Sequence, residues 1–278
     1  MLLTEDQQMI REALRSFVQE QITPHAARWD KEHHFPQDVH RGLAALGCYG
    51  ICVPESYGAA GLDYVSLAVV LEEIAAGDGG TSTVISVTNC PVNAILMRYG
   101  SEAQKQKYLP KLCSGEHIGA LAMSEPNAGS DAAALRTTAR RDGDRYILNG
   151  VKQFISGAGE TDLYLVMART GQDGARGISA FILEKGMEGL SFGVNEQKMG
   201  WRAQPTRQVI MENVRVPKEN MLGEPGQGFK IAMSGLDGGR LNIGACSLGG
   251  AQRCLDEAVS YTKERKQFGT AIADFQNT

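Results

Sequence analysis

The sequence has no excess of charge of one sign and no hydrophobic run of membrane-spanning length. The chain has 28 lysines and arginines and 32 aspartates and glutamates, which gives a net charge of -4. This balance excludes the strongly basic surface that nucleic-acid binding needs. A membrane-spanning helix needs roughly 20 consecutive apolar residues, and no segment approaches that length. Residues 2–7 have neither the basic region nor the apolar core of a secretory signal, so we expect a cytoplasmic protein.

Cysteine pairs and nucleotide-binding motifs are also missing. The six cysteines show no Cys-x-x-Cys spacing and lie mostly in apolar segments, which predicts reduced structural thiols without disulfides. No Gly-x-Gly-x-x-Gly motif follows an early strand and no phosphate-binding loop occurs, which argues against a Rossmann domain. One polar segment holds residues of metal-ligand type, but adjacent histidines point in different directions, so we favour a solvated loop for Asp30, Glu32, His33, His34 and His40.

Residues 1–117 are predicted to form an all-α domain. Thr4 and Gln7 fit a capping box, and apolar residues then recur at helical spacing. Ser101 and Gln104 repeat the same capping pattern before a later helix. Beyond the first helix, the predicted helices cover residues 36–46, 64–76 and 101–112.

Residues 118–224 change to the short, alternating apolar runs of β-strands. Hairpin signals at Asp142-Gly143 and Asn149-Gly150 punctuate the segment, which predicts an antiparallel β domain. The predicted strands cover residues 118–123, 146–148, 163–168, 178–183 and 209–216. Pro225 and Gly226 separate this domain from a helical region over residues 225–278, whose helix is predicted to start near Gly228. The fold class is therefore α+β with several domains.

Two clusters of small and polar residues border predicted strands. In the first, which covers residues 123–131, Pro126 ends the strand, Gly129 frees the backbone, and Ser124 and Ser130 offer hydroxyl groups. The second covers residues 153–159, follows a turn signal and precedes the strand at 163–168. A single cluster of this kind is more often a capped turn, but two can line one ligand pocket.

Several glycines interrupt the predicted C-terminal helix, each costing up to about 1 kcal/mol against alanine: Gly235, Gly238, Gly239, Gly244, Gly249 and Gly250. We place a ligand beside Arg240, which is otherwise a charge in an apolar stretch. Close helix packing is the alternative, and it explains the later glycines at least as well. An i, i+3 ion pair between Asp237 and Arg240 also stays open.

The motif Ser124-Glu125-Pro126-x-Ala128-Gly129-Ser130-Asp131 resembles the first signature of the acyl-CoA dehydrogenase family, and Phe154-Ile155-Ser156 resembles its second flavin-contacting segment. The resemblance spans the chain. It implies an FAD-dependent oxidoreductase that desaturates an acyl-CoA thioester and passes electrons to an electron-transferring flavoprotein. It also implies a homotetramer, a barrel-like middle domain, and only the first part of a C-terminal helical domain. Segments 156–162, 200–207 and 236–243 look most like the short, branched-chain members.

The resemblance assigns roles to individual residues. The FAD contacts that it implies are Leu121, Met123, Ser124, Gly129, Ser130, Phe154, Ile155 and Ser156. A later segment resembles one that reaches the FAD of a neighbouring subunit, and its residues are Arg265, Phe268 and Gln276. The implied substrate contacts are Ser130, Asp237 and Arg240. Phe154 stands where many relatives have Trp, which keeps an aromatic face but loses an N–H donor.

The catalytic base is the clearest departure from the family pattern. Desaturation needs a base for the α proton and a cofactor that accepts a hydride. The usual Glu lies beyond Thr278, and the position that some relatives use instead holds Gly239, which cannot act as a base. Asp237 is a candidate, although it is a more natural partner for Arg240. We therefore expect a C-terminally truncated acyl-CoA dehydrogenase, with a non-catalytic acyl-CoA- or flavin-binding fragment and an acyl-CoA oxidase as alternatives.

Overall fold

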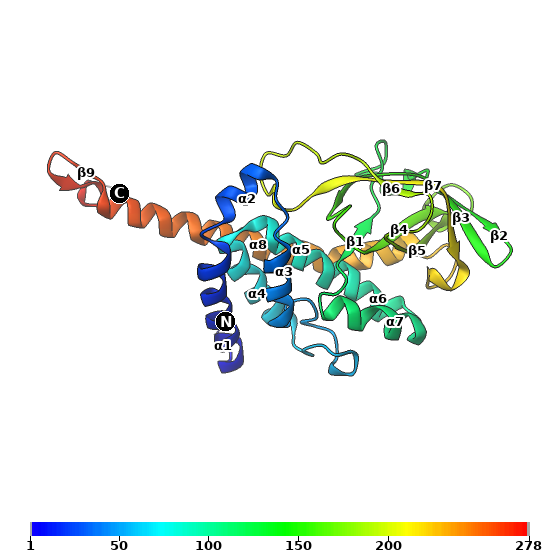
Figure 1. Cartoon of the computed structure of the whole chain (residues 1–278), viewed down its shortest axis with the longest axis horizontal. Coiled ribbons are helices and arrows are strands. Elements are labelled where there is room, and N and C mark those ends of the chain that lie inside the picture. The colour runs from blue at the N-terminus through cyan, green and yellow to red at the C-terminus, as the bar shows by residue number, and fades with distance from the viewer. Residues whose placement is uncertain (1, 277–278) are drawn as a thin grey trace.

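A helical body, a β-sheet and one long helix that runs along both make up the computed structural model, which describes residues 2–276 (Figure 1). The capping boxes predicted at Thr4 with Gln7 and at Ser101 with Gln104 are both confirmed. The helices of the body are α1 (Glu5–Phe17), α2 (Ala26–Glu32), α3 (Gln37–Ala45), α4 (Tyr64–Gly77), α5 (Gly79–Val87), α6 (Ala94–Tyr99) and α7 (Glu102–Cys113), with π-helical turns at Val18–Ile22 and Thr88–Asn93.

The segment interpreted as a solvated loop is partly helical. Asp30 and Glu32 lie on α2, and His33 ends this helix in the left-handed region with φ of 53°. Trp29 is buried and fixes α2 against the body, whereas His40 is buried on α3. The loop interpretation holds for His33 and His34, which lie between α2 and α3, and was wrong for Asp30, Glu32 and His40. Residues 2–276 contain no group of His, Cys, Asp and Glu that could hold a metal ion.

The middle of the chain forms an eight-stranded sheet in the order β6-β7-β3-β2-β4-β5-β8, with β1 paired to β4. Its pairings are antiparallel as predicted, except that β1 and β2 run parallel to β4. Hairpin signals govern only strands that are neighbours in sequence, so they could not reveal this pairing. The strands are β1 (Gly119–Ala122), β2 (Thr138–Asp142), β3 (Arg145–Ser156), β4 (Leu163–Arg169), β5 (Ile178–Glu184), β6 (Leu190–Phe192), β7 (Thr206–Pro217) and β8 (Met221–Leu222).

The sheet curls around its own core. The rings of Tyr146 and Phe181 lie 5.0 Å apart, and those of Tyr164 and Phe192 lie 5.3 Å apart. Each pair joins strands that are not neighbours in the sheet, so the sheet folds over on itself in the expected barrel-like manner. Alternate residues of β4 face the other way and pack against α7 and α8, including Leu163, Leu165 and Met167.

Asn149-Gly150 is not the predicted hairpin turn. β3 continues through this dipeptide, and its register against β7 shifts between Leu148 and Gly150. Gly150 has φ of 149°, and a Cβ there would lie 2.4 Å from Oγ1 of Thr137. The shift places the extra residue on β7, where Asn213 has φ of 56°, and β3 continues through Gly150 to the second cluster. The hairpin at Asp142-Gly143 does form, joining β2 to β3.

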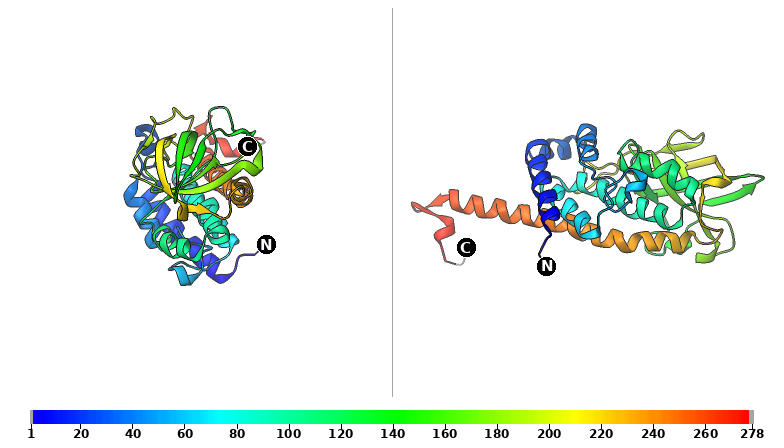
Figure 2. Two further views of the ribbon diagram at one scale, coloured as in Figure 1. Left: turned by 90° about the vertical axis from the view of Figure 1, so that its right-hand side faces the viewer. Right: turned by 90° about the horizontal axis from the view of Figure 1, so that it is seen from below.

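Helix α8 (Gly228–Glu264) begins where predicted, passes beneath the sheet and the helical body, and then projects beyond them (Figure 2). Gly249 contacts α4 so closely that a Cβ would lie 2.0 Å from the carbonyl oxygen of Glu72. Gly235 packs equally closely on Pro91, which supports the helix-packing alternative for these two glycines. Two short strands, β9 (Lys266–Gln267) and β10 (Thr270–Ala271), follow. None of the helices within residues 2–276 is long and apolar enough to span a membrane.

Candidate functional site

The two polar clusters lie side by side. The first follows β1 and the second includes the end of β3, where the N–H of Gln153 donates to the carbonyl oxygen of Ser124 over 2.8 Å. This main-chain bond joins the clusters directly, although β1 and β3 are not paired strands. The second cluster does not follow a turn as predicted, because β3 continues through Asn149-Gly150 to Ser156.

A buried ion pair underlies both clusters. Nζ of Lys152 lies 2.8 Å from Oε1 of Glu125 and donates to the carbonyl oxygen of Met123 over 3.1 Å. Burial lowers the pKa of Lys152 to about 8, against the opposing effect of Glu125. Burial raises the pKa of Glu125, but Lys152 and main-chain donors outweigh it, so this pKa lies below its ordinary value. Sequence reasoning missed the pair, although a lysine in an otherwise apolar strand was a usable signal.

The side chains of the clusters form an open surface with free hydroxyl groups. Ser124 and Ser156 are half-buried and Ser130 is exposed, and no hydrogen bond within residues 2–276 engages any of the three hydroxyls. Phe154 has φ of 57° and is 65% exposed, so the left-handed backbone turns its ring outward. Of the remaining predicted contacts in this region, Leu121 and Met123 are half-buried, Gly129 is exposed and Ile155 is buried.

On α8 the predicted substrate residues are exposed and not paired with each other. Asp237 and Arg240 form no ion pair in the part of the chain that the structure describes, so the i, i+3 alternative that the sequence left open is not formed. The helix is held here by Gly238, where a Cβ would lie 2.6 Å from Sγ of Cys90. Gly239 has more room, since the nearest atom to a Cβ there is the carbonyl oxygen of Cys90 at 4.0 Å.

The last predicted contacts lie far from the clusters, at the projecting end of α8 (Figure 2). Arg265 caps this helix, and the exposed Phe268 lies in the hairpin that follows, with its ring 6.4 Å from that of Phe275. Gln276 is the last residue that the structure describes. One chain therefore does not bring Arg265, Phe268 and Gln276 together with Ser124 and Ser156.

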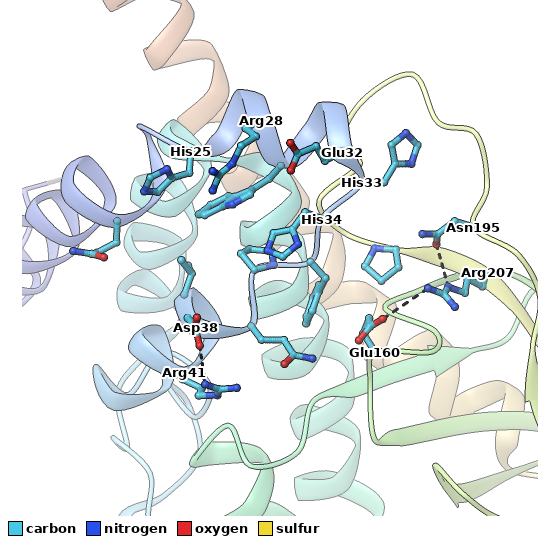
Figure 3. A pocket seen from close by; sticks show the side chains of 17 residues that line it. His25, Arg28, Glu32, His33, His34, Asp38, Arg41, Glu160, Asn195 and Arg207 are labelled. Carbon is cyan, nitrogen blue, oxygen red and sulfur yellow. Dashed lines mark hydrogen bonds and ion pairs between the residues drawn. The ribbon is translucent and has the colours of Figure 1, made fainter.

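A cleft of about 910 Å³ lies between α2, α3 and loops of the sheet (Figure 3). It is polar, and its charged groups are partly paired within it. Arg207 lies 3.7 Å from Glu160 and donates to Asn195 over 3.2 Å, and Arg41 lies 2.7 Å from Asp38. None of the predicted site residues lines this cleft, so it is separate from the candidate site.

Family models match all three parts of the chain. Models described as the acyl-CoA dehydrogenase N-terminal, middle and C-terminal domains match residues 4–116, 120–214 and 226–278. The chain belongs to the acyl-CoA dehydrogenase family. Within this family, it is 50% identical over 275 residues to "Isobutyryl-CoA dehydrogenase, mitochondrial" of Dictyostelium discoideum, covering 99% of this chain and 66% of that relative.

Two solved acyl-CoA dehydrogenase-like structures extend the comparison. A chain from the structure described as "Electron transferring flavoprotein of Acidaminococcus fermentans" has a TM-score of 0.95 and 46% identity, covering 99% of this chain and 73% of that one. An acyl-CoA dehydrogenase from Bacillus anthracis complexed with FAD has a TM-score of 0.92 and 36% identity, covering 98% and 47%. The chain thus spans about two thirds of the length of the curated relative.

Proposed function

We propose that this acyl-CoA dehydrogenase chain binds FAD and a short or branched acyl-CoA, and that the enzyme to which it belongs oxidises the thioester between Cα and Cβ. The observation that carries the proposal is the main-chain bond from Gln153 to Ser124, which sets the two clusters beside each other. The FAD complex of the Bacillus anthracis neighbour supports the cofactor. The isobutyryl-CoA dehydrogenase relative supports the substrate class.

The residues of the clusters fit a flavin. Ser124 and Ser156 present hydroxyls that no other group within residues 2–276 engages, and such donors suit the nitrogen and oxygen atoms at the ring edge. Phe154 presents an exposed aromatic face, which suits a planar ring. When bound, FAD supplies the hydride acceptor that no side chain can provide. The remaining flavin contacts assigned to this surface are Leu121, Met123, Gly129, Ser130 and Ile155.

The substrate residues act by binding and orientation. Arg240 brings a permanently charged fork of donors to the side of α8, and it is not held by Asp237. We assign Arg240 and Asp237 to the thioester end of the substrate and Ser130 to the acyl-CoA chain. Holding the thioester at fixed positions lowers the entropic part of the barrier to reaction.

The far end of α8 serves another subunit in this proposal. Arg265, Phe268 and Gln276 contact the FAD of a neighbour, which explains why an exposed arginine and phenylalanine project away from their own clusters. The assembly is a homotetramer, and an electron-transferring flavoprotein takes the electrons, as the Acidaminococcus neighbour suggests. The domain limits of 1–117, 118–224 and 225–278 stay predictions. The cytoplasmic location also stays a prediction, because the Dictyostelium relative is named as mitochondrial.

Visible absorption of the purified 278-residue chain tests this proposal. We expect a bound flavin spectrum after FAD is added and the excess removed, and a change in that spectrum when isobutyryl-CoA is added anaerobically. Arg240→Ala should weaken the response to isobutyryl-CoA and leave FAD retention unchanged. A chain that retains no FAD would contradict the assignment of the clusters. Peroxide formed during aerobic turnover would indicate an oxidase in place of a dehydrogenase.

Binding without oxidation is the second candidate function of the chain itself. It is favoured by Gly239, which supplies no carboxylate at the position where some relatives carry the base. Asp237 is exposed and stays a weak candidate for that role. Under this alternative, isobutyryl-CoA perturbs the flavin spectrum without bleaching it. Anaerobic bleaching by the 278-residue chain would exclude it and direct attention to Asp237.

A further inference from the structure

The buried pair of Lys152 and Glu125 has no part in the function proposed so far. The Lys152 side chain is 0% exposed and that of Glu125 is 8% exposed. Burying two charges commonly costs more free energy than burying an apolar pair of the same shape. Stability alone therefore does not explain why these two charges are buried. The segments that the pair holds together provide a better explanation.

The bonds of the pair lead to the first cluster, to the end of β3 and to the segment before β2. Lys152 precedes Gln153 on β3 and donates to the carbonyl oxygen of Met123. Glu125 follows Ser124, and its carboxylate accepts the main-chain N–H groups of residues 136 and 137 over 2.6 and 2.9 Å. The pair thus ties the end of β3, the start of the first cluster and the entry to β2 into one network.

We propose that Lys152 and Glu125 are positioning residues for the flavin, fixing the separation of the Ser124 and Ser156 hydroxyls. We call this pair the cluster clamp. The inference rests on the proposed function, because it concerns the same surface. A hydrogen bond weakens steeply beyond about 3.2 Å, so two hydroxyls on separate segments serve one rigid ring only if the segments are held together. The bond from Gln153 to Ser124 joins them at one point, and the cluster clamp adds two more, from Lys152 to Met123 and to Glu125.

Glu125→Gln tests the cluster clamp against a matched control. The control is Glu73→Gln on α4, since Glu73 has a side chain 10% exposed and an ion pair with Arg15 at 2.7 Å, but lies outside both clusters. The dissociation constant for FAD and the spectrum of bound FAD are measured in the 278-residue chain at a temperature where all variants are folded. The unfolding midpoint is measured beside them.

We expect Glu125→Gln to raise the dissociation constant about tenfold and to move the flavin bands toward those of free FAD. Glu73→Gln should lower the unfolding midpoint and leave the dissociation constant within about twofold of wild type. Unchanged FAD binding in a folded Glu125→Gln variant would overturn the proposal. Equal weakening in Glu73→Gln would also overturn it, because loss of stability alone would then explain the effect.

Hydrogen exchange at the Gln153 amide supplies a measurement that needs no flavin. In Lys152→Met this amide should exchange at least about tenfold faster than in wild type, while amides of β4 that pair with β5 keep their protection. An unchanged Gln153 rate would overturn the cluster clamp. A wild-type chain that binds no FAD would contradict the proposed function, and exchange would still decide whether the clamp exists. Failure of both clamp variants to fold, with Glu73→Gln folded, would assign the pair a purely structural role.

Discussion

At the scale of single residues, His40 is a buried base whose protonation opposes folding. Its side chain is 4% exposed and stacks on Phe35, and its Nδ1 lies 2.8 Å from the hydroxyl of Tyr49. Burial lowers the pKa of His40 from 6.5 to about 3. The unfolded chain therefore takes up a proton below pH 6.5 that the folded chain takes up only near pH 3. The free energy of unfolding therefore decreases as the pH is lowered from 6.5 to about 3, by at most about 1.4 kcal/mol per pH unit.

His40→Gln removes this titration and keeps a polar group beside Tyr49. Between about pH 6.5 and about pH 4.5, the free energy of unfolding of the variant should fall by roughly 2 kcal/mol less than that of wild type. Urea unfolding at each pH measures the difference. The control His34→Gln changes an exposed histidine and should follow the wild-type curve. Parallel curves for His40→Gln and wild type would show that the acid sensitivity has another source.

Gly239 gives a direct test of whether a carboxylate at this position of α8 can act as the general base. A Cβ there meets a single atom, the carbonyl oxygen of Cys90 at 4.0 Å, so a longer side chain fits at this point of α8. Gly239→Glu should raise the rate at which isobutyryl-CoA reduces bound flavin by about 100-fold, the usual contribution of a positioned general base. Anaerobic stopped-flow absorption measures this rate.

The matched control for that prediction is Gly244→Glu. Gly244 also lies on α8, and a Cβ there meets no atom within 4 Å, but it is more than one turn away. It adds the same charge and the same gain in helix propensity without bringing a carboxylate to the proposed substrate position. Equal rates in the two variants and wild type would mean that the substrate does not approach Gly239.

Site residues that belong to a local motif can be predicted from the sequence, whereas site residues that need a partner from a distant segment cannot. The hydroxyls of Ser124 and Ser156 follow from local motifs, and the structure places their two segments together. Lys152 could not be placed, because its partner Glu125 is 27 residues away in sequence and no local pattern links the two. Asp237 and Arg240 have the spacing of an ion pair, yet both side chains extend to solvent, where such a pair gains little.

At the scale of elements, two adjacent glycines on α8 have opposite roles. A Cβ at Gly249 would lie 2.0 Å from the carbonyl oxygen of Glu72 and 2.9 Å from Cβ of Ala75, both on α4. A Cβ at Gly250 would meet no atom within 4 Å. Gly249 therefore sets the distance between α4 and α8, while Gly250 only weakens the helix.

Alanine substitution should separate the two glycines. Gly249→Ala forces the helices apart and should lower the free energy of unfolding by about 1–3 kcal/mol. Gly250→Ala should raise it by roughly 0.5–1 kcal/mol through helix propensity. Urea unfolding monitored by circular dichroism measures both. A destabilising Gly250→Ala, or a neutral Gly249→Ala, would show that the contact between α4 and α8 is looser than described.

Helices whose ends are marked by local residues were predicted correctly. Elements that depend on contacts with distant segments were not. The caps at Thr4 and Ser101 and the start of α8 at Gly228 were correct, because capping and Pro-Gly punctuation are local. α2 was missed, since its one buried anchor, Trp29, gives no helical period. The parallel pairing of β1 with β4 was missed because strand direction is set by contacts distant in sequence.

At the scale of the whole molecule, α8 presents an apolar stripe that the chain does not cover. Leu241, Leu248 and Leu255 recur at every seventh residue, and they are 74%, 63% and 57% exposed. Val259 extends the stripe toward the projecting end, where no other α-helix of residues 2–276 lies against α8 (Figures 1 and 2). A stripe of this spacing is the seam along which helices pair.

We expect the 278-residue chain to self-associate through this stripe. Burying a leucine side chain stabilises an interface by about 1.5–3 kcal/mol, so Leu248→Gln with Leu255→Gln should weaken association by at least about 100-fold. Sedimentation equilibrium over a range of concentrations measures the dissociation constant. Met199→Gln is the control, because Met199 is a fully exposed apolar side chain that lies in the loop between β6 and β7. A wild-type chain that is monomeric at every concentration would contradict pairing along α8, and an equal effect of Met199→Gln would show that association is not specific to this helix.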